Sequence, residues 1–198
     1  VGKDPKSTYA ADVFSDVLNT PGSTFQKRLV DSGLWQAVGV NYYTLNQVGP
    51  ISVSGQTTPE KLRPALAALE KELARFTDST YVTKAELEAV KAQRATSSAF
   101  GIEKASEIAH TIGFWWSVAS LDYFMGYTDQ MATQTIGDLM RYTSTYIVGK
   151  AHVGLAMLSD TSLRASKLTE EDLIEGVDCR GAAAFLDYAA DADVSLFV

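Results

Sequence analysis

Residues 22–35 read GSTFQKRLVDSGLW, and this stretch organises the chain on both sides of it. Ser23 or Thr24 can cap a short helix that runs through Val30, because a hydroxyl side chain accepts a hydrogen bond from the first helical turn. Gly33 then supplies the left-handed backbone geometry on which helices commonly end. The stretch therefore predicts one short helix held between two turns.

A longer helix is expected just before this stretch. Ala10, Val13, Phe14 and Val17 recur at spacings of three and four, which places one apolar stripe along a helix from Ser7 to Leu18. The run Asn19-Thr20-Pro21-Gly22 stops that helix, since proline and asparagine favour turns.

Two strands are expected just after it. Residues 37–45 are rich in valine and tyrosine, and residues 48–54 alternate Ile51 and Val53 with small polar side chains. Asn46-Gln47 between them predicts a hairpin. Gly49-Pro50 indicates an edge or a bulge at the start of the second strand.

Helical patterns dominate the rest of the chain. Thr58 is a helix cap with Pro59 in the first turn, and Pro64 lies close enough to the start to bend this helix without abolishing it. Thr83 and Glu86 form the spacing of a capping box. The helices predicted from these patterns cover residues 58–76, 83–94, 102–112 and 135–146, with a last short one opening at 169–172.

The predicted fold class is α+β, an antiparallel or mixed sheet with helices packed on one face. Its third strand is expected at Lys150–Leu158, where Val153, Leu155 and Met157 share a face. Residues 1–175 are interpreted as one domain. Residues 176–198 are a tail in which 181–190 favours helix and 194–198 favours strand.

Composition excludes several classes of function. The chain has 198 residues, of which 46% are hydrophobic, so it can bury a full core. Its formal net charge of −7 argues against a nucleic-acid groove, which needs clustered lysine and arginine. Cys179 is the single cysteine, so no internal disulfide can form. No apolar run approaches the roughly 20 residues of a membrane span.

Few residues are available for chemistry. The sequence has two histidines, and His110 shares a helix face with Glu107. A metal site needs three or four ligands and no second such pair exists, so a partly buried helix histidine beside an acidic neighbour is the favoured interpretation. His152 is expected on the solvated side of the third strand. No G-x-S-x-G turn, phosphate loop or dinucleotide motif occurs.

Aromatic side chains gather in one later segment, at Phe114-Trp115-Trp116 and at Tyr123, Phe124 and Tyr127. Tryptophan and tyrosine are enriched at interfaces, so these residues could line a groove for a peptide. They could equally fill a corner of the core between two helices. The core interpretation is favoured, and both stay open.

Residues 22–35 resemble the motif G-x-S-R-L-x-x-x-L-R-x-x-x-G-L-A-Y of the pitrilysin/insulinase family of zinc peptidases, which includes the mitochondrial processing peptidases. The resemblance extends over about residues 4–158. It continues in the family's order through the tyrosine-rich strand, the Gly49-Pro50 strand, helix 58–76, VTKAELEAVK at 82–91, FGIE at 100–103, helix 135–146 and a closing strand.

That family holds zinc with H-x-x-E-H and a later glutamate in its N-terminal unit. This chain has no H-x-x-E-H and so resembles the C-terminal, non-metal unit, without the strand that normally precedes the first helix. The resemblance implies a zinc-bearing peptidase domain or subunit as partner and a peptide as substrate. Zinc is expected only in that partner, and no cofactor is expected in this chain.

Active relatives place an arginine and a tyrosine of this motif near the substrate. Aligned on Gly33, those positions are Leu29 and Gln36, while Arg28 and Trp35 lie one residue away with the same separation of seven. The resemblance thus implies no catalytic or metal-ligating residue here, and four candidate substrate-binding residues: Arg28, Trp35, Gln36 and Tyr42.

The leading interpretation is a non-catalytic C-terminal domain that helps enclose peptide opposite a zinc-bearing domain of a metalloendopeptidase. The chain alone is then inactive. The alternative is a catalytically dead family member that acts as an interaction or scaffold subunit, and a third is an unrelated α+β ligand-binding domain. The resemblance implies the bacterial periplasm or cell envelope, with the cytoplasm as the alternative compartment.

Without the family's first strand, one edge of the sheet is left with unpaired backbone groups, and such edges recruit another strand. The apolar tail Val194–Val198 is the expected cover, with a second chain as the alternative. Deleting Ala192–Val198 should then lower the melting temperature or promote aggregation, measured by thermal unfolding and light scattering. A truncated chain that stays monomeric and equally stable would contradict this expectation.

Overall fold

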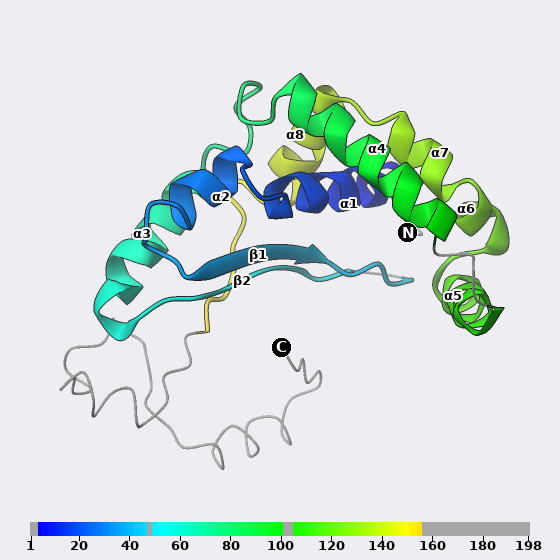
Figure 1. Ribbon diagram of the computed structural model, residues 1–198, viewed down its shortest axis with the longest axis horizontal. Helices are drawn as coiled ribbons and strands as arrows, with labels where there is room; N and C mark the ends of the chain where they lie inside the picture. Colours follow the sequence, from blue (N-terminus) through cyan, green and yellow to red (C-terminus); the bar gives the residue numbers. More distant parts are fainter. Residues whose placement is uncertain (1–3, 47–48, 101–104, 156–198) are drawn as a thin grey trace, which may run out of the picture. The chain divides into compact units, whose positions relative to one another are not determined.

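The computed structural model describes residues 4–46, 49–100 and 105–155. Within them, the chain up to His152 forms one compact unit (Figure 1). The order of elements is two helices, a hairpin, a 3-10 turn and six further helices. The α+β class predicted from the sequence is confirmed, with a sheet of two strands among the described residues.

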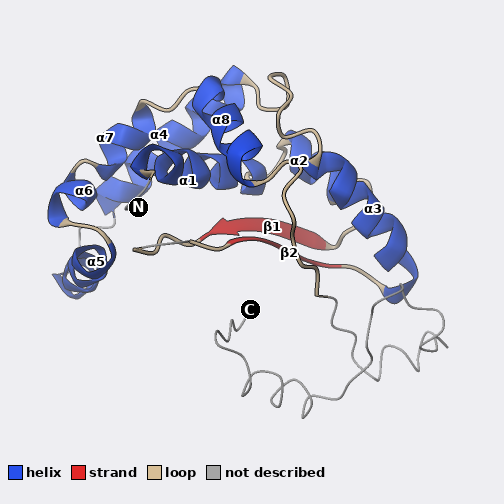
Figure 2. Cartoon of the chain, turned by 180° about the vertical axis from the view of Figure 1, so that it is seen from behind, coloured by secondary structure: helices blue, strands red, loops and turns tan. Residues whose placement is uncertain are grey.

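Helix α1 (Pro5–Asn19) is the centre of the unit. The Asp4 carboxylate caps it by accepting a hydrogen bond from the Ser7 backbone N–H at 3.1 Å. It packs against the hairpin and against α2, α4, α7 and α8. Figures 1 and 2 show α1 lying along one face of the hairpin, with α4 and α8 beyond it on the same side. The helix predicted at 7–18 is confirmed and extends slightly at both ends.

Helix α2 (Thr24–Leu29) follows the turn that the sequence predicts. Ser23 Oγ accepts from the Gln26 N–H at 3.2 Å, so Ser23 is the cap. The backbone φ angles of Gly22 and Gly33 are 82° and 75°, which favours glycine at both positions. The helix ends at Leu29, so Gly33 shapes the turn into the next strand.

The hairpin consists of β1 (Ala37–Tyr42) and β2 (Ile51–Gln56), paired antiparallel with Val40 opposite Val53. Its buried face carries Val38 and Val40, which pack beneath α1. The predicted hairpin is confirmed, but its connection is longer than the two residues expected, because β1 ends at Tyr42.

The outer edge of β1 is closed by side chains. The Asn19 carboxamide accepts from the Val40 N–H at 2.8 Å and donates to the Val40 carbonyl at 2.7 Å, as a neighbouring strand would. Gln26 Nε2 donates to the Val38 carbonyl at 3.1 Å. The end of α1 and the start of α2 therefore occupy the edge at which a further strand could have paired. For β2, the described residues supply no strand on the side away from β1.

The remaining elements follow the hairpin. The cap predicted at Thr58 is wrong, because its side chain makes no capping hydrogen bond, and the helix predicted at 58–76 is a 3-10 turn followed by a helix that ends at Leu73. Thr83 and Glu86 exchange both capping-box hydrogen bonds, and so do Thr135 and Asp138. The two short helices α6 and α7 were not predicted. The elements are a 3-10 turn (Pro59–Lys61), α3 (Leu62–Leu73), α4 (Lys84–Phe100), α5 (Ala105–Val118), α6 (Leu121–Met125), α7 (Tyr127–Ala132) and α8 (Ile136–Tyr146).

Glu86 also connects the start of α4 to the start of α2. Its Oε2 caps α4 at the Thr83 N–H, at 2.8 Å, while its Oε1 accepts from the Thr24 N–H in the first turn of α2, at 3.2 Å. One carboxylate thus serves two helix N-termini that are far apart in sequence.

The third strand predicted at Lys150–Leu158 is wrong over its described part. Residues 150–155 have no strand partner, and Val153 is 97% exposed. Alternating apolar residues form a strand only when a neighbouring strand accepts their backbone hydrogen bonds. Residues 156–158, the segments predicted at 169–172, 181–190 and 194–198, and the domain boundary at 175/176 lie outside the described residues.

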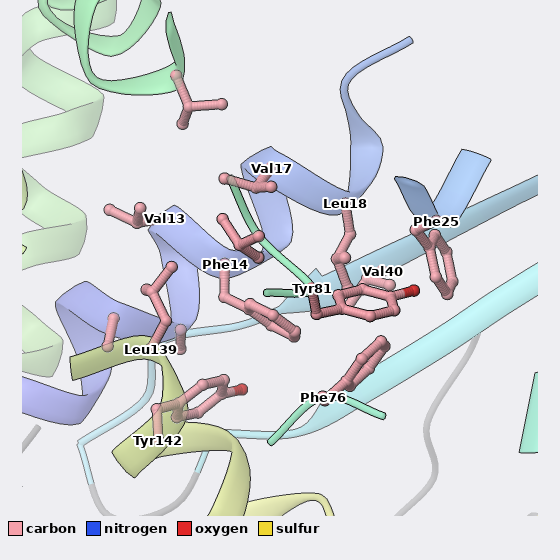
Figure 3. Close-up of a cluster of buried hydrophobic side chains, with 14 of the residues drawn as sticks. Val13, Phe14, Val17, Leu18, Phe25, Val40, Phe76, Tyr81, Leu139 and Tyr142 are labelled. Atoms are coloured by element: carbon pink, nitrogen blue, oxygen red, sulfur yellow. The ribbon is translucent and has the colours of Figure 1, made fainter. Parts of the chain in front are cut away.

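The core is built around aromatic rings. Phe14 of α1 meets Phe76 edge-on, with ring centroids 4.9 Å apart, and lies 6.1 Å from Tyr142 of α8 (Figure 3). Edge-to-face pairs of this kind add to the stabilisation from buried apolar area. Among the described residues, no helix combines the length and the apolar character needed to cross a bilayer.

The closed β1 edge generates a prediction. Asn19→Ala removes both hydrogen bonds to the buried Val40 backbone, so the free energy of unfolding should fall by about 1–3 kcal/mol. Chemical denaturation measures it. Asn41→Ala is the control, because Asn41 is exposed on the same strand. Equal stability of both variants would contradict the role assigned to Asn19.

Candidate functional site

Arg28, the first predicted substrate-binding residue, is engaged within the domain. Its guanidinium lies 3.3 Å from both carboxylate oxygens of Glu72, which is 6% exposed. Tyr81 Oη donates to Glu72 Oε2 at 2.8 Å, and Arg75 lies 3.8 Å from Glu72. A buried carboxylate is costly unless it is paired, and here two guanidiniums and a phenol compensate it.

This cluster joins α2, α3 and the segment before α4. Burial, followed by the hydrogen bond to Glu72, raises the pKa of Tyr81, so its hydroxyl stays protonated as a donor. The Arg28 side chain keeps 39% of its surface exposed. Arg28 and Glu72 therefore form a structural ion pair in which one side of the guanidinium is exposed to solvent.

The other three predicted residues do not gather around Arg28. Trp35 is 7% exposed, and its Nε1 donates to the Ala65 carbonyl at 3.1 Å. Gly55 lies over the indole ring, where a Cβ would come within 2.8 Å. Gln36 is exposed just before β1 and Tyr42 is half-buried at its other end. The structure therefore distributes these side chains along the motif and hairpin.

The aromatic segment forms part of a pocket of about 290 Å³. Five elements build it: α1, the segment after β1, α4, α5 and α7. Its lining residues are Asp12, Tyr43, Thr44, Arg94, Phe114, Trp115 and Tyr127.

The pocket walls are rings in contact with one another. Trp115 lies 5.1 Å from Tyr127 and Tyr43 lies 5.9 Å from Phe114, measured between centroids. Behind them, Tyr123 stacks on the buried Tyr9 at 5.0 Å. The aromatic segment thus contributes both to the core and to a pocket, and Trp116 stays 70% exposed.

The acidic group of the pocket is Asp12. Tyr127 Oη donates a hydrogen bond to its Oδ2. Burial raises the pKa of Asp12 to about 6, against the opposing effects of the Tyr127 hydrogen bond and the Arg94 charge. Its Oδ1 receives no hydrogen bond from the residues that the structure describes.

Arg94 forms an ion pair with the neighbouring carboxylate of Asp16. Its Nε lies 2.7 Å and its Nη2 2.6 Å from Asp16 Oδ2, while burial raises the pKa of Asp16 against this pairing. The sequence pointed to the aromatic walls of this pocket but not to its acidic group, because Asp12 and Tyr127 are 115 residues apart and belong to separate helices.

The histidines do not form a metal site with other described residues. His110 lies on α5, but the partial burial predicted for it is wrong, because its side chain is exposed. His152 Nε2 lies 3.0 Å from Glu70 Oε1, and the Lys150 carbonyl, followed by Glu70, raises the pKa of His152. No group of three or more histidine, cysteine, aspartate or glutamate residues suited to a metal occurs within residues 4–46, 49–100 and 105–155.

Comparison with known proteins relates this α+β unit to inactive peptidase domains. Residues 1–94 match the family described as "Peptidase M16 inactive domain". The resemblance to the C-terminal, non-metal unit of pitrilysin/insulinase-like zinc peptidases is thereby confirmed for this segment. No protein of curated function matches the chain.

Solved structures share the fold. The inactive peptidase domain of a protein assigned as a zinc protease from Bordetella parapertussis superposes with a TM-score of 0.63 at 18% identity, over 73% of this chain and 79% of that one. A protein assigned as a zinc protease from Bordetella pertussis Tohama I superposes with a TM-score of 0.60 at 18% identity, over 73% of this chain and 80% of that one. A protease from Helicobacter pylori superposes with a TM-score of 0.57 at 23% identity over 71% of this chain. The match covers 35% of the Helicobacter pylori protease, so the matched part of this chain spans about a third of that protein.

The raised pKa of Asp12 generates a prediction for stability. A carboxyl group whose pKa is about 6 when folded and about 4 when unfolded stabilises the fold below pH 4, and this contribution is lost as the pH rises through 6. Asp12→Asn removes the ionisation. Its unfolding free energy relative to the parent should rise by up to about 3 kcal/mol between pH 4 and pH 7.5.

Urea unfolding at a series of pH values measures this difference. Asp31→Asn is the control, because Asp31 is exposed. A difference between Asp12→Asn and the parent that does not change with pH would show that Asp12 titrates normally.

Proposed function

We propose that this chain is the non-catalytic domain of a zinc-peptidase-like protein, where it binds peptide and helps to enclose it opposite a zinc-bearing domain. The observation that carries the proposal is the match of residues 1–94 to an inactive peptidase domain. The described residues offer no metal-ligand group, which agrees with a division of work between two domains.

In such a protein, a zinc ion in the partner domain would polarise the scissile carbonyl and support attack by water. The work of this chain is to hold the peptide. Catalysis gains from this because a substrate held in a productive orientation reacts faster than one that diffuses freely.

Two surfaces of the domain suit a peptide. The exposed residues of the hairpin on the side away from α1 are small or polar, as at Asn41 and Ser54, so an extended backbone can approach closely. The aromatic pocket beside Asp12 offers a place for one side chain. Extended peptides are commonly recognised by strand edges combined with side-chain pockets.

The ion pair of Arg28 and the burial of Trp35 favour a second candidate, the catalytically dead scaffold subunit. Arg28 is paired with Glu72 and Trp35 lies in the core, so these interactions already occupy both side chains and do not place them to stabilise a transition state. A scaffold would keep the same fold without needing a peptide. The bacterial periplasm or cell envelope is the compartment that we propose for either role, on the resemblance alone.

The domain deletion tests the two roles. The complete protein should contain zinc and cleave an unstructured peptide, and removing residues 4–155 should leave zinc bound while hydrolysis falls at least about tenfold. Zinc content is measured by metal analysis and cleavage by chromatography. The isolated chain should cleave nothing, with or without added zinc.

Two results would go against the enclosing role. Unchanged hydrolysis after the deletion would favour the scaffold. Chelator-sensitive cleavage by the isolated chain would show that it carries a catalytic site of its own.

A further inference from the structure

We propose that the pocket between α1, α4, α5 and α7 binds the cationic side chain of a lysine or arginine in an extended peptide. The inference rests on the proposed peptide-binding function and specifies which residue the domain selects. It follows from three properties of the pocket: an open carboxylate oxygen, aromatic walls, and a volume that fits one side chain.

The first property is the carboxylate. Asp12 uses Oδ2 to accept from Tyr127, while Oδ1 has no donor among the described residues. Asp12 lines the pocket, so this oxygen is available to a donor placed there. An ammonium or guanidinium group would supply both the missing hydrogen bond and the opposite charge.

The nearby charged residues do not supply a cation to the free oxygen of Asp12. Arg94 is the cation beside Asp12, but its guanidinium contacts Asp16 at 2.6 Å. One arginine facing two carboxylates leaves one negative charge in the pocket when Asp12 is ionised. Because the pocket lies partly out of water, that charge interacts more strongly with a bound cation than it would on the surface.

The second property is the set of aromatic walls. Tyr43, Phe114, Trp115 and Tyr127 all line the pocket. The faces of aromatic rings attract cations, and tryptophan does so most strongly. An acidic side chain would be repelled by Asp12, and a neutral polar side chain could donate to its oxygen but would not supply the opposite charge.

The third property is size. A volume of about 290 Å³ lies at the lower limit for small-molecule pockets and suits a single long side chain. The adjacent Trp116 is largely exposed and offers an apolar surface for the residues on either side of the bound one. A peptide therefore fits this site better than a free amine, which would use only the pocket floor.

Binding of matched peptides to the 198-residue chain tests the inference. Three unstructured fluorescent peptides differ only at the central residue, which is lysine, the uncharged norleucine or glutamate. Fluorescence anisotropy at pH 7.5 should show the lysine peptide binding at least about tenfold more tightly than the norleucine peptide, with the glutamate peptide weakest.

Asp12→Asn should remove the preference for lysine over norleucine while keeping the fold, because asparagine has the same shape and can still accept from Tyr127. Trp115→Leu should reduce the preference without reversing it. Asp31→Asn, an exposed substitution, should bind like the parent. Thermal unfolding of each variant verifies that it is folded.

The outcomes separate the two proposals. Equal binding of all three peptides, unaffected by Asp12→Asn, would overturn the pocket assignment and leave peptide binding in place. Binding of none would overturn both. Free lysine amide that displaces the peptide at a concentration near the peptide's own Kd would overturn the peptide as the occupant and identify a small amine instead.

Discussion

Helix α1 is buried along most of its length, and the other elements are arranged around this burial. Apolar residues such as Phe14 and Val17 face the hairpin and the surrounding helices at the same time. A helix enclosed in this way must also satisfy its polar side chains internally. Asp12 meets Tyr127, Asp16 meets Arg94, and Asn19 meets Val40, so three polar residues of α1 each attach a different part of the chain to it.

Local chemistry made much of the fold predictable. The predicted caps at Ser23 and Thr83 are present, because each depends on groups within three residues of one another, whereas the cap predicted at Thr58 is not formed. The third strand failed because the alternation at Val153 carries no information about a pairing partner. Helices α6 and α7 were missed because they are shorter than the windows over which helical periodicity shows.

The candidate site was less accessible from the sequence than the fold. The family motif identified Arg28 and Trp35, yet the structure uses them for an ion pair with Glu72 and for core packing. The pocket depends on Asp12 and Tyr127, which only the tertiary structure brings together. The aromatic residues Phe114, Trp115 and Tyr127 were the one available sign, and such residues can equally fill a corner of the core. Sites of this kind become visible when long-range contacts are known.

The carboxylate of Glu86 has a consequence for how the domain loses its structure. By accepting from Thr83 and from Thr24, it makes the first turns of α4 and α2 share one acceptor. If α4 frays at its start, α2 loses its bond to the same group, so the two helix ends open together. The short segment that begins at Ser23 is thereby protected by a helix more than sixty positions later in the chain, since 62 residues separate Thr24 from Glu86. This shared acceptor couples the opening of the two helix starts, which are distant in the sequence.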